Sequence, residues 1–172
     1  MILASEDASR NGSIVSSVVL DRFTQWLQAY ADKYKDGGTC EESLKIFLGP
    51  QVRAEHMYSD GSKEFAKAAN KLKITHDRST PHRPQTNGEA ERAVRKVKEG
   101  TIATLQQSGL NHLWWAEAQS CFCFLHNFVD PQRENQTPYF QRFGVEFNGP
   151  KIAFGALLMY KPANPDLLSK QN

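Results

Sequence analysis

Short β-branched and apolar runs in the first half of the chain predict strands. Residues 13–20 read SIVSSVVL directly after the Asn11-Gly12 turn signal, and Ile2–Ala4 resembles the stub of a preceding strand. We therefore expect a hairpin between these two segments. Residues 23–30 (FTQWLQAY) permit a third strand or a short helix, and two further strands are predicted over 52–58 and 74–77.

Helical spacing of apolar residues predicts four helices, over 39–48, 63–73, 89–107 and 113–128. Thr39 is the expected cap of the first, and Gly49-Pro50 ends it. The buried stripe of the third and longest helix is predicted to be Ala90, Val94, Val97, Thr101 and Leu105. Strands and helices that alternate in this order indicate an α/β fold with a mixed sheet.

Composition is that of a globular protein, with 172 residues, 40% hydrophobic and 23% charged. No stretch approaches the roughly 20 apolar residues of a membrane span, and no secretory signal is evident, so we expect an intracellular protein, nuclear or cytoplasmic. Three scattered cysteines indicate neither a disulfide framework nor a zinc site.

Charge is segregated along the chain. Residues 61–100 hold 10 Lys and Arg against 5 Asp and Glu, whereas residues 1–60 hold 6 against 9. A basic middle beside an acidic first third is typical of a phosphate-binding surface next to a carboxylate site. A solvated helix face rich in Lys and Arg explains the same charges equally well.

Three carboxylates stand at the ends of predicted elements. Asp7 follows the first strand stub, Asp60 follows the strand over 52–58, and Glu91 lies in the first turn of the long helix. If the strand stub before Asp7 and the strand over 52–58 are parallel neighbours, Asp7 and Asp60 emerge at one edge of the sheet. Three convergent carboxylates suit Mg²⁺ or Mn²⁺, and two such ions support phosphoryl transfer. Taken singly, each acid is more simply a surface residue or a cap.

The amino-acid sequence around Asp60 and Glu91 is a more specific signal than the acids themselves. Residues 59–65 read SDGSKEF, and residues 79–92 read STPHRPQTNGEAER. Both strings closely resemble the integrase catalytic core of retroviruses and retrotransposons. Residues 19–26 (VLDRFTQW) are similar to a strand of the same family. Its copia-like branch is matched by WAEA at 115–118, Asn127, TPY at 137–139, FG at 154–155 and Tyr160.

This resemblance implies an RNase H-like fold, in which a mixed five-stranded sheet is flanked by helices. We assign residues 1–130 to the catalytic core and residues 131–172 to a loop-rich C-terminal extension of that core. The implied activity is DNA integration: a two-metal polynucleotidyl transferase trims a DNA 3′ end and joins it to target DNA. DNA and further copies of the chain, as a dimer or higher oligomer, are the implied partners.

The resemblance also implies an Asp, Asp, Glu triad that binds two Mg²⁺ or Mn²⁺ ions. By motif the second acid is Asp60 and the third is Glu91; Glu89 faces another side of the helix. We assign the first acid to Asp7, and the alternatives are Glu6 and Asp21. Asp21 fits a structural role at a strand end better.

Three departures from the family pattern favour other functions. Only 30 residues separate Asp60 from Glu91, fewer than is common in the family, and Gly61 and Ser62 replace its usual Asn and Gly. The zinc module and terminal barrel of integrases have no counterpart here. One alternative is therefore a decayed or domesticated domain that binds nucleic acid or dimerises without cutting. Another is a metal-dependent nuclease.

DNA contacts are predicted from the loop and the helix that follows it. The loop residues are His82, Arg83, Gln85 and Asn87, and the helix adds Arg95 and Lys98 on the face of Glu91. The alternative for the two cations is a solvated helix face. The aromatic residues between 114 and 124 are assigned to the core or an interface rather than to base stacking, and His56 to a structural role.

Overall fold

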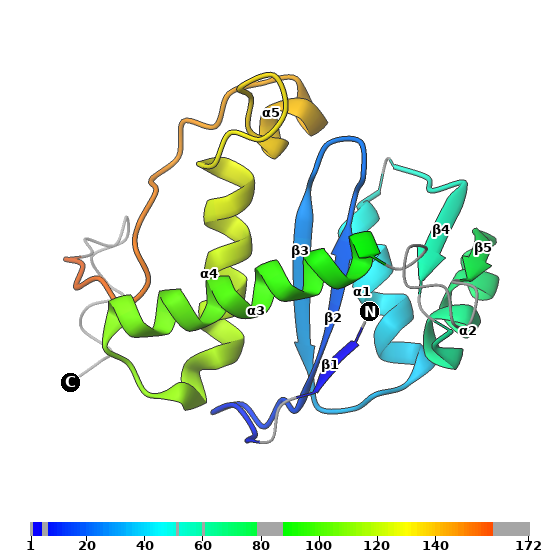
Figure 1. Ribbon diagram of the computed structural model, residues 1–172, viewed down its shortest axis with the longest axis horizontal. Helices are drawn as coiled ribbons and strands as arrows, with labels where there is room; N and C mark the ends of the chain where they lie inside the picture. Colours follow the sequence, from blue (N-terminus) through cyan, green and yellow to red (C-terminus); the bar gives the residue numbers. More distant parts are fainter. Residues whose placement is uncertain (1, 5–6, 51, 60, 79–87, 160–172) are drawn as a thin grey trace, which may run out of the picture.

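The computed structural model describes residues 2–4, 7–50, 52–59, 61–78 and 88–159. Five strands lie in this part of the chain: β1 (Ile2–Ala4), β2 (Val15–Leu20), β3 (Leu27–Asp32), β4 (His56–Ser59) and β5 (Thr75–Arg78). The helices are α1 (Gly37–Leu48), α2 (Lys63–Lys71), α3 (Gly88–Ser108), a 3-10 turn η2 (His112–Trp114), α4 (Trp115–Phe128) and α5 (Pro138–Phe143). The predicted mixture of strands and helices is confirmed (Figure 1).

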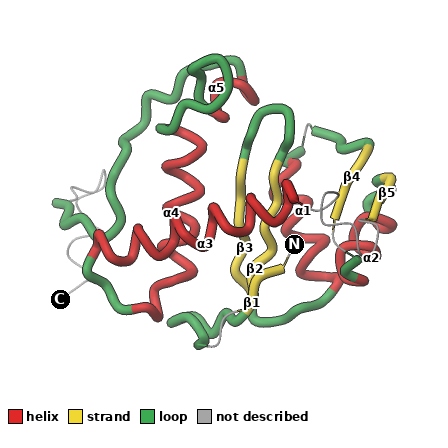
Figure 2. The backbone as a smooth tube through the Cα atoms, in the orientation of Figure 1, coloured by secondary structure: helices red, strands yellow, loops and turns green. Residues whose placement is uncertain are grey.

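The strands form two small sheets rather than the predicted five-stranded sheet. β1, β2 and β3 form an antiparallel sheet, and β4 pairs with β5 in parallel. The two groups stand apart in Figure 2. The described residues contain no ladder between β1 and β4, and the described register of β1 with β2 runs from Ile2 opposite Ser17 to Ala4 opposite Val15.

Helices cover both faces of β2. On one face, Val18 packs with Ala93 and Val97 of α3 and with Cys123 of α4, and Leu20 lies against the same cluster. On the other face, Val19 packs against the cluster of Cys40, Leu44, Phe65 and Ala68 from α1 and α2. Successive residues of a strand point to opposite faces, so this run of valines and leucine reads as a strand buried on both sides.

The helix ends differ by a few residues from the prediction. α1 begins at Gly37, two residues early, because the Asp36 carboxylate caps it by accepting hydrogen bonds from the backbone N–H groups of Gly38 and Thr39, at 2.7 and 2.9 Å. The Thr39 and Gly38 amides hold the pKa of Asp36 below its usual range. Ser62 caps α2 in the same way through Phe65.

The buried stripe of α3 consists of Ala93, Val97 and Thr101, one position out of phase with part of the predicted set. The stripe is shifted because α4 crosses α3 here and covers its small residues. A Cβ on Gly100 would collide with the ring of Phe122 on α4, so only glycine permits this close approach.

The segment after α4 folds back onto the core through aromatic rings. Trp26, which is buried at the turn between β2 and β3, contacts Phe128 at a centroid distance of 5.5 Å and Phe143 of α5 at 5.6 Å. The Arg142 guanidinium lies over the Phe47 ring and donates a hydrogen bond to the Phe47 carbonyl at the end of α1. α5 thus joins α1, α4 and the β2–β3 turn.

A single buried amide closes the outer edge of β3. The Asn127 side chain of α4 accepts a hydrogen bond from the Leu27 N–H at 2.9 Å and donates one to the Leu27 carbonyl at 2.7 Å. Both groups belong to a strand edge without another strand partner among the described residues. The amide therefore satisfies polar backbone groups that would otherwise be buried unpaired.

We predict that Asn127→Ala lowers the free energy of unfolding by about 3 kcal/mol, because both Leu27 groups lose their partner in a buried place. Urea unfolding followed by circular dichroism measures the change. Ser120→Ala, an exposed substitution on the same helix, is the control and should alter stability by less than about 0.5 kcal/mol. Equal effects of the two variants would contradict the assigned role of Asn127.

One histidine of α4 is also buried. The His126 side chain is 1% exposed; its Nε2 lies 3.3 Å from the Gln25 carbonyl oxygen, and its Nδ1 lies 3.8 Å from Asp130. Burial, and then the charge of Lys96, lowers the pKa of His126 despite the opposing effect of Asp130. The folded chain therefore favours the neutral imidazole.

Because this pKa is lower in the folded than in the unfolded chain, its contribution to stability is complete above the ordinary histidine pKa of about 6.5 and is lost as pH falls below it. We expect wild type to lose more stability than His126→Gln between pH 7.5 and pH 5.5 in urea titrations. His112→Gln, at an exposed histidine, should follow wild type. An identical pH dependence in His126→Gln would contradict this account.

Candidate active site

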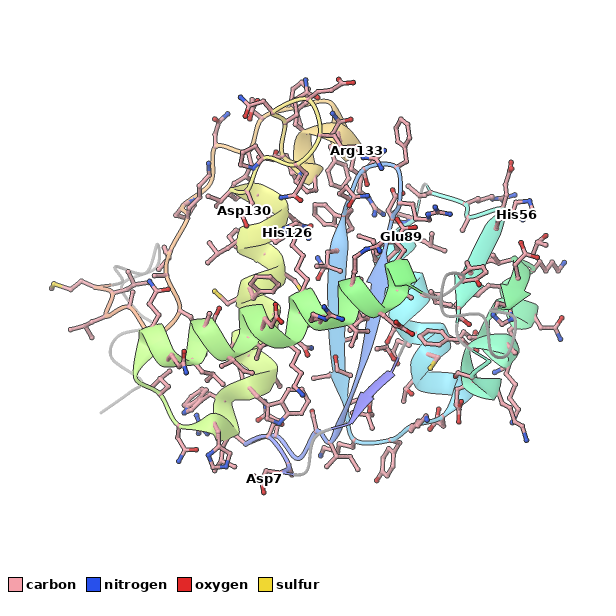
Figure 3. The ribbon with its side chains drawn as sticks, viewed as in Figure 1. Asp7, His56, Glu89, His126, Asp130 and Arg133 are labelled. Carbon is pink, nitrogen blue, oxygen red and sulfur yellow. The ribbon has the colours of Figure 1, made fainter. Side chains whose placement is uncertain are left out.

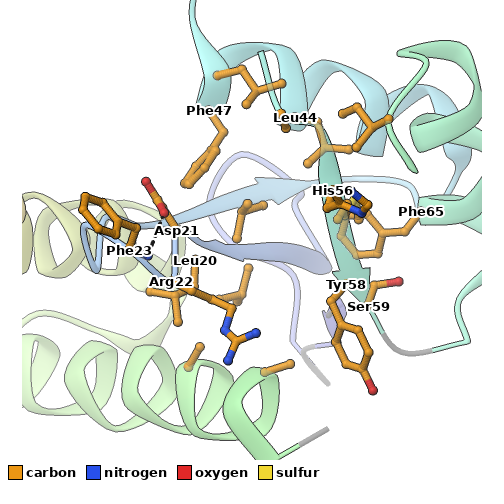
Figure 4. A pocket seen from close by; sticks show the side chains of 18 of the residues that line it. Leu20, Asp21, Arg22, Phe23, Leu44, Phe47, His56, Tyr58, Ser59 and Phe65 are labelled. Carbon is orange, nitrogen blue, oxygen red and sulfur yellow. Dashed lines mark hydrogen bonds between the residues drawn. The ribbon is translucent and has the colours of Figure 1, made fainter. Parts of the chain in front are cut away.

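A cavity of about 850 Å³ lies between the two sheets. Val18–Leu20 of β2 and the turn 21–23 form one wall, and His56–Ser59 of β4 forms the other (Figure 4). Leu44 and Phe47 of α1 and Phe65 of α2 line one face, and Glu89, Ala90 and Ala93 of α3 line the opposite face. We call this cavity the inter-sheet cleft.

The cleft brings together two segments that carry predicted acids. Ser59, the last residue of β4 and the neighbour of Asp60, lines it, as do residues 89, 90 and 92 around Glu91 in the first turn of α3. Asp60 itself lies outside the described residues. Glu91 is exposed to solvent. The end of β4 and the start of α3 therefore border one cavity, although 28 residues lie between Ser59 and Gly88.

Asp7 lies elsewhere. Its carboxylate is 3.4 Å from His112 Nε2, and its backbone carbonyl accepts a hydrogen bond from the Trp115 indole at 3.2 Å. These partners follow the C-terminal end of α3, whereas Glu91 is at the N-terminal end of that helix. The 21 residues of α3 span about 30 Å. Figure 3 shows Asp7 at the lower edge of the molecule and Glu89 near its middle, above the start of α3.

The structure therefore does not bring Asp7 and Glu91 together. For Asp7 to serve as the first acid, it would have to leave His112 and Trp115. Among the described residues, no three His, Cys, Asp or Glu side chains are grouped as metal ligands. The alternative Glu6 lies outside the described residues.

Asp21, the other alternative, has the predicted structural role. Its carboxylate accepts hydrogen bonds from the Phe23 N–H at 2.9 Å and from the Thr24 hydroxyl at 2.7 Å, and so it closes the turn after β2. The next residue, Arg22, forms an ion pair with Glu89, with Nε and Oε2 2.6 Å apart. This pair connects the β2–β3 turn to the start of α3 across the cleft.

Sequence reasoning missed the Arg22–Glu89 pair and a second polar contact at the end of β4. The Ser59 hydroxyl, which is buried, lies 2.8 Å from Nε2 of His76 on β5. This hydrogen bond joins β4 and β5 next to Asp60. The register pairs Ser59 with Arg78 and His76 with Met57, so the contact is a diagonal one between the two strands, and no local sequence signal reveals it.

Of the predicted DNA-contacting residues, Arg95 and Lys98 are described, and both are exposed on α3. His82, Arg83, Gln85 and Asn87 lie outside the described residues. His56, assigned a structural role, is exposed at the cleft wall with Nδ1 3.8 Å from Asp77. The ring of Trp114 is covered by Arg10, whose guanidinium carbon lies 3.8 Å from the ring centroid in a cation–π contact.

No family model matches the sequence. Among curated proteins, it is 28% identical over 144 residues to a retrovirus-related Pol polyprotein from transposon RE2 of Arabidopsis thaliana, a match that covers 78% of this chain and 10% of the relative. The polyprotein from transposon RE1 of the same plant is 26% identical with the same coverage. That from transposon TNT 1-94 of Nicotiana tabacum is 35% identical over 77 residues, which is 45% of this chain and 6% of the relative.

Solved structures decide the fold. A chain of the simian T-cell lymphotropic virus intasome, solved in complex with PP2A regulatory subunit B56 gamma, is similar with a TM-score of 0.65 and 18% identity. The match covers 94% of this chain and 56% of the intasome chain. The catalytic core domain of BIV integrase is similar with a TM-score of 0.56 and 19% identity. The match covers 81% of this chain and 88% of the BIV integrase chain. The chain has the fold of a retroviral integrase catalytic core.

The resemblance predicted from the motifs is thus confirmed, and the sequence relatives of this chain are retrovirus-related Pol polyproteins of transposons. The chain spans about a tenth of the length of the first two relatives. In the part of the chain that the structure describes, no helix has the length and apolarity that crossing a membrane requires.

Proposed function

We propose that this integrase core is a polynucleotidyl transferase of retrotransposon origin, which processes DNA 3′ ends and joins them to target DNA. The observation that carries the proposal is the shared border of the inter-sheet cleft: β4, which leads into Asp60, and the first turn of α3, which carries Glu91, both reach it. The relatives are polyproteins of transposons, and one structural neighbour is part of an intasome.

The residues present suit divalent metal ions. Carboxylate oxygens are the ligands that Mg²⁺ and Mn²⁺ prefer. In our proposal Asp60 and Glu91 hold the ions, and the first acid, assigned to Asp7, joins them only after the rearrangement described above. When bound, two such ions supply activation of the attacking oxygen and stabilisation of the leaving oxygen.

In the proposal, the cationic side chains of α3 bind the DNA phosphates. Arg95 and Lys98 follow Glu91 by four and seven residues on α3, so the three side chains share one helix face. In the proposed complex the two cations bind phosphates on either side of the reacting bond, and the loop residues His82, Arg83, Gln85 and Asn87 contact the DNA near it. Further copies of the chain are proposed as partners, because the intasome neighbour belongs to an assembly.

A core that binds DNA without cutting it is the second candidate. The position of Asp7 favours it, because only two of the three predicted acids belong to segments that border the cleft. A metal-dependent nuclease would use the same acids but would join no ends. The products of the reaction distinguish the three functions.

We expect the wild-type chain with Mn²⁺ to rejoin a branched DNA substrate, and Glu91→Gln to reduce the rate at least about a hundredfold while DNA affinity is kept. The reason is that the amide removes a charged metal ligand without changing the size of the side chain. Gel analysis of labelled strands measures the products. Glu99→Gln, an exposed glutamate on the same helix, is the matched control and should retain activity.

Cleavage without rejoining in this assay would indicate a nuclease, and binding without either product would indicate the non-cutting domain. Equal activity of wild type and Glu91→Gln would refute the proposed role of Glu91.

The phosphate contacts have their own test. We expect Arg95→Gln and Lys98→Gln each to reduce the slope of log affinity against log salt concentration by about 1, since each removes one cation from the interface. Fluorescence anisotropy with duplex DNA at several salt concentrations measures this slope. Lys33→Gln, which follows β3 at the end away from the β2–β3 turn, should leave it unchanged. The same loss in all three variants would indicate diffuse attraction instead.

A further inference from the structure

Arg22 is presented to the start of α3 by a rigid turn. The Asp21 carboxylate accepts hydrogen bonds from the Phe23 N–H and the Thr24 hydroxyl. The Gln25 side chain donates another to the Arg22 carbonyl at 2.8 Å. These bonds fix the backbone on both sides of Arg22, whereas 76% of its side chain is exposed. Figure 4 shows this side chain reaching from the turn toward the ribbon of α3.

The ion pair that Arg22 forms with Glu89 is an exposed one. Its Nε lies 2.6 Å from Oε2 of Glu89, and 35% of the Glu89 side chain is also exposed. Ion pairs at such places are weak, because water screens both charges, and breaking one lowers a binding constant by at most about fivefold. Arg22 can therefore exchange Glu89 for an anion that it binds more strongly.

The charges around this pair favour such an anion. Among the described residues that line the inter-sheet cleft, arginines outnumber acids by four to two. The acids are Asp21, whose oxygens are bonded within its own turn, and Glu89. Arg92 turns back toward the first residue of α3, since a Cβ on Gly88 would lie 3.6 Å from its Nη1. The four arginines are Arg22, Arg53, Arg92 and Arg142. The cleft lining is therefore net positive, and Glu89 is the acid that offsets it at the start of α3.

We propose that Arg22 binds a DNA phosphate, and that Glu89 holds Arg22 until DNA arrives. A guanidinium binds a phosphate through two parallel N–H···O bonds, and each phosphate that it neutralises releases counterions from the DNA. This gain exceeds the loss of one exposed ion pair. The inference rests on the proposed function, since its ligand is the DNA of that function. It adds a contact from the β2–β3 turn at the start of α3, whereas Arg95 and Lys98 lie further along the helix.

The first test removes the cation of the pair. We expect Arg22→Gln to reduce the slope of log affinity against log salt concentration by about 1, and Arg22→Lys to keep the slope, because lysine retains the charge. Fluorescence anisotropy with labelled duplex DNA, without divalent metal, measures both. The matched control is Lys45→Gln on α1, which breaks an ion pair of the same 2.6 Å length with Glu41 and should leave the slope unchanged.

The second test removes the acid. We expect Glu89→Gln to raise the affinity for the same duplex, because Arg22 then has no pair to break and the phosphates meet one negative charge fewer. In the Arg22→Gln background only the second effect remains. The gain from Glu89→Gln should therefore be about threefold larger in the wild-type chain than in that background, within the limit that an exposed pair sets. A gain of affinity cannot arise from a failure to fold.

Two results would overturn the inference alone. One is an unchanged salt slope in Arg22→Gln while the wild-type chain binds DNA. The other is an equal gain from Glu89→Gln in both backgrounds, which would make Glu89 a mere repulsive charge. A wild-type chain whose binding to duplex DNA shows no salt dependence would refute the proposed phosphate contacts as well. Because binding is measured without divalent metal, a chain that binds DNA but does not join it leaves the inference standing.

Discussion

Burial of β2 on both faces is the constraint on which the rest of this fold depends. Val18 and Val19, adjacent in the chain, belong to two different hydrophobic clusters, one with α3 and α4 and one with α1 and α2. The second cluster also holds Met57 of β4. β2 and β4 therefore rest on the same helical layer, which positions Ser59 at the end of β4.

The same constraint places the start of α3. Ala93 and Val97 are small enough to lie on β2, and Gly100 lets α4 cross close behind them. The first turn of α3 then projects past the end of β2, where Glu89 meets Arg22. The first turn of α3, which carries Glu89 and Glu91, thus lies at the cleft because Ala93 and Val97 pack on β2.

The segment after α4 contributes to this core. Trp26, Phe128 and Phe143 gather around the β2–β3 turn, and Arg142 binds the last carbonyls of α1. These contacts hold the turn that carries Arg22. Within the described residues 131–159 of the expected loop-rich extension, the helix α5 packs against Trp26, the end of α1 and α4.

The sequence by itself determined the element order, the strand over residues 15–20 and the integrase resemblance, because these follow from local composition and periodicity and from long contiguous motifs. It also indicated the structural role of Asp21, which needs only its own turn. The tertiary structure alone decided that the strands form two sheets, that Asp7 joins His112 rather than Glu91, and that Ser59 meets His76. Each of these depends on strand register or helix length, which place residues distant in the chain against one another and leave no periodic trace in the sequence.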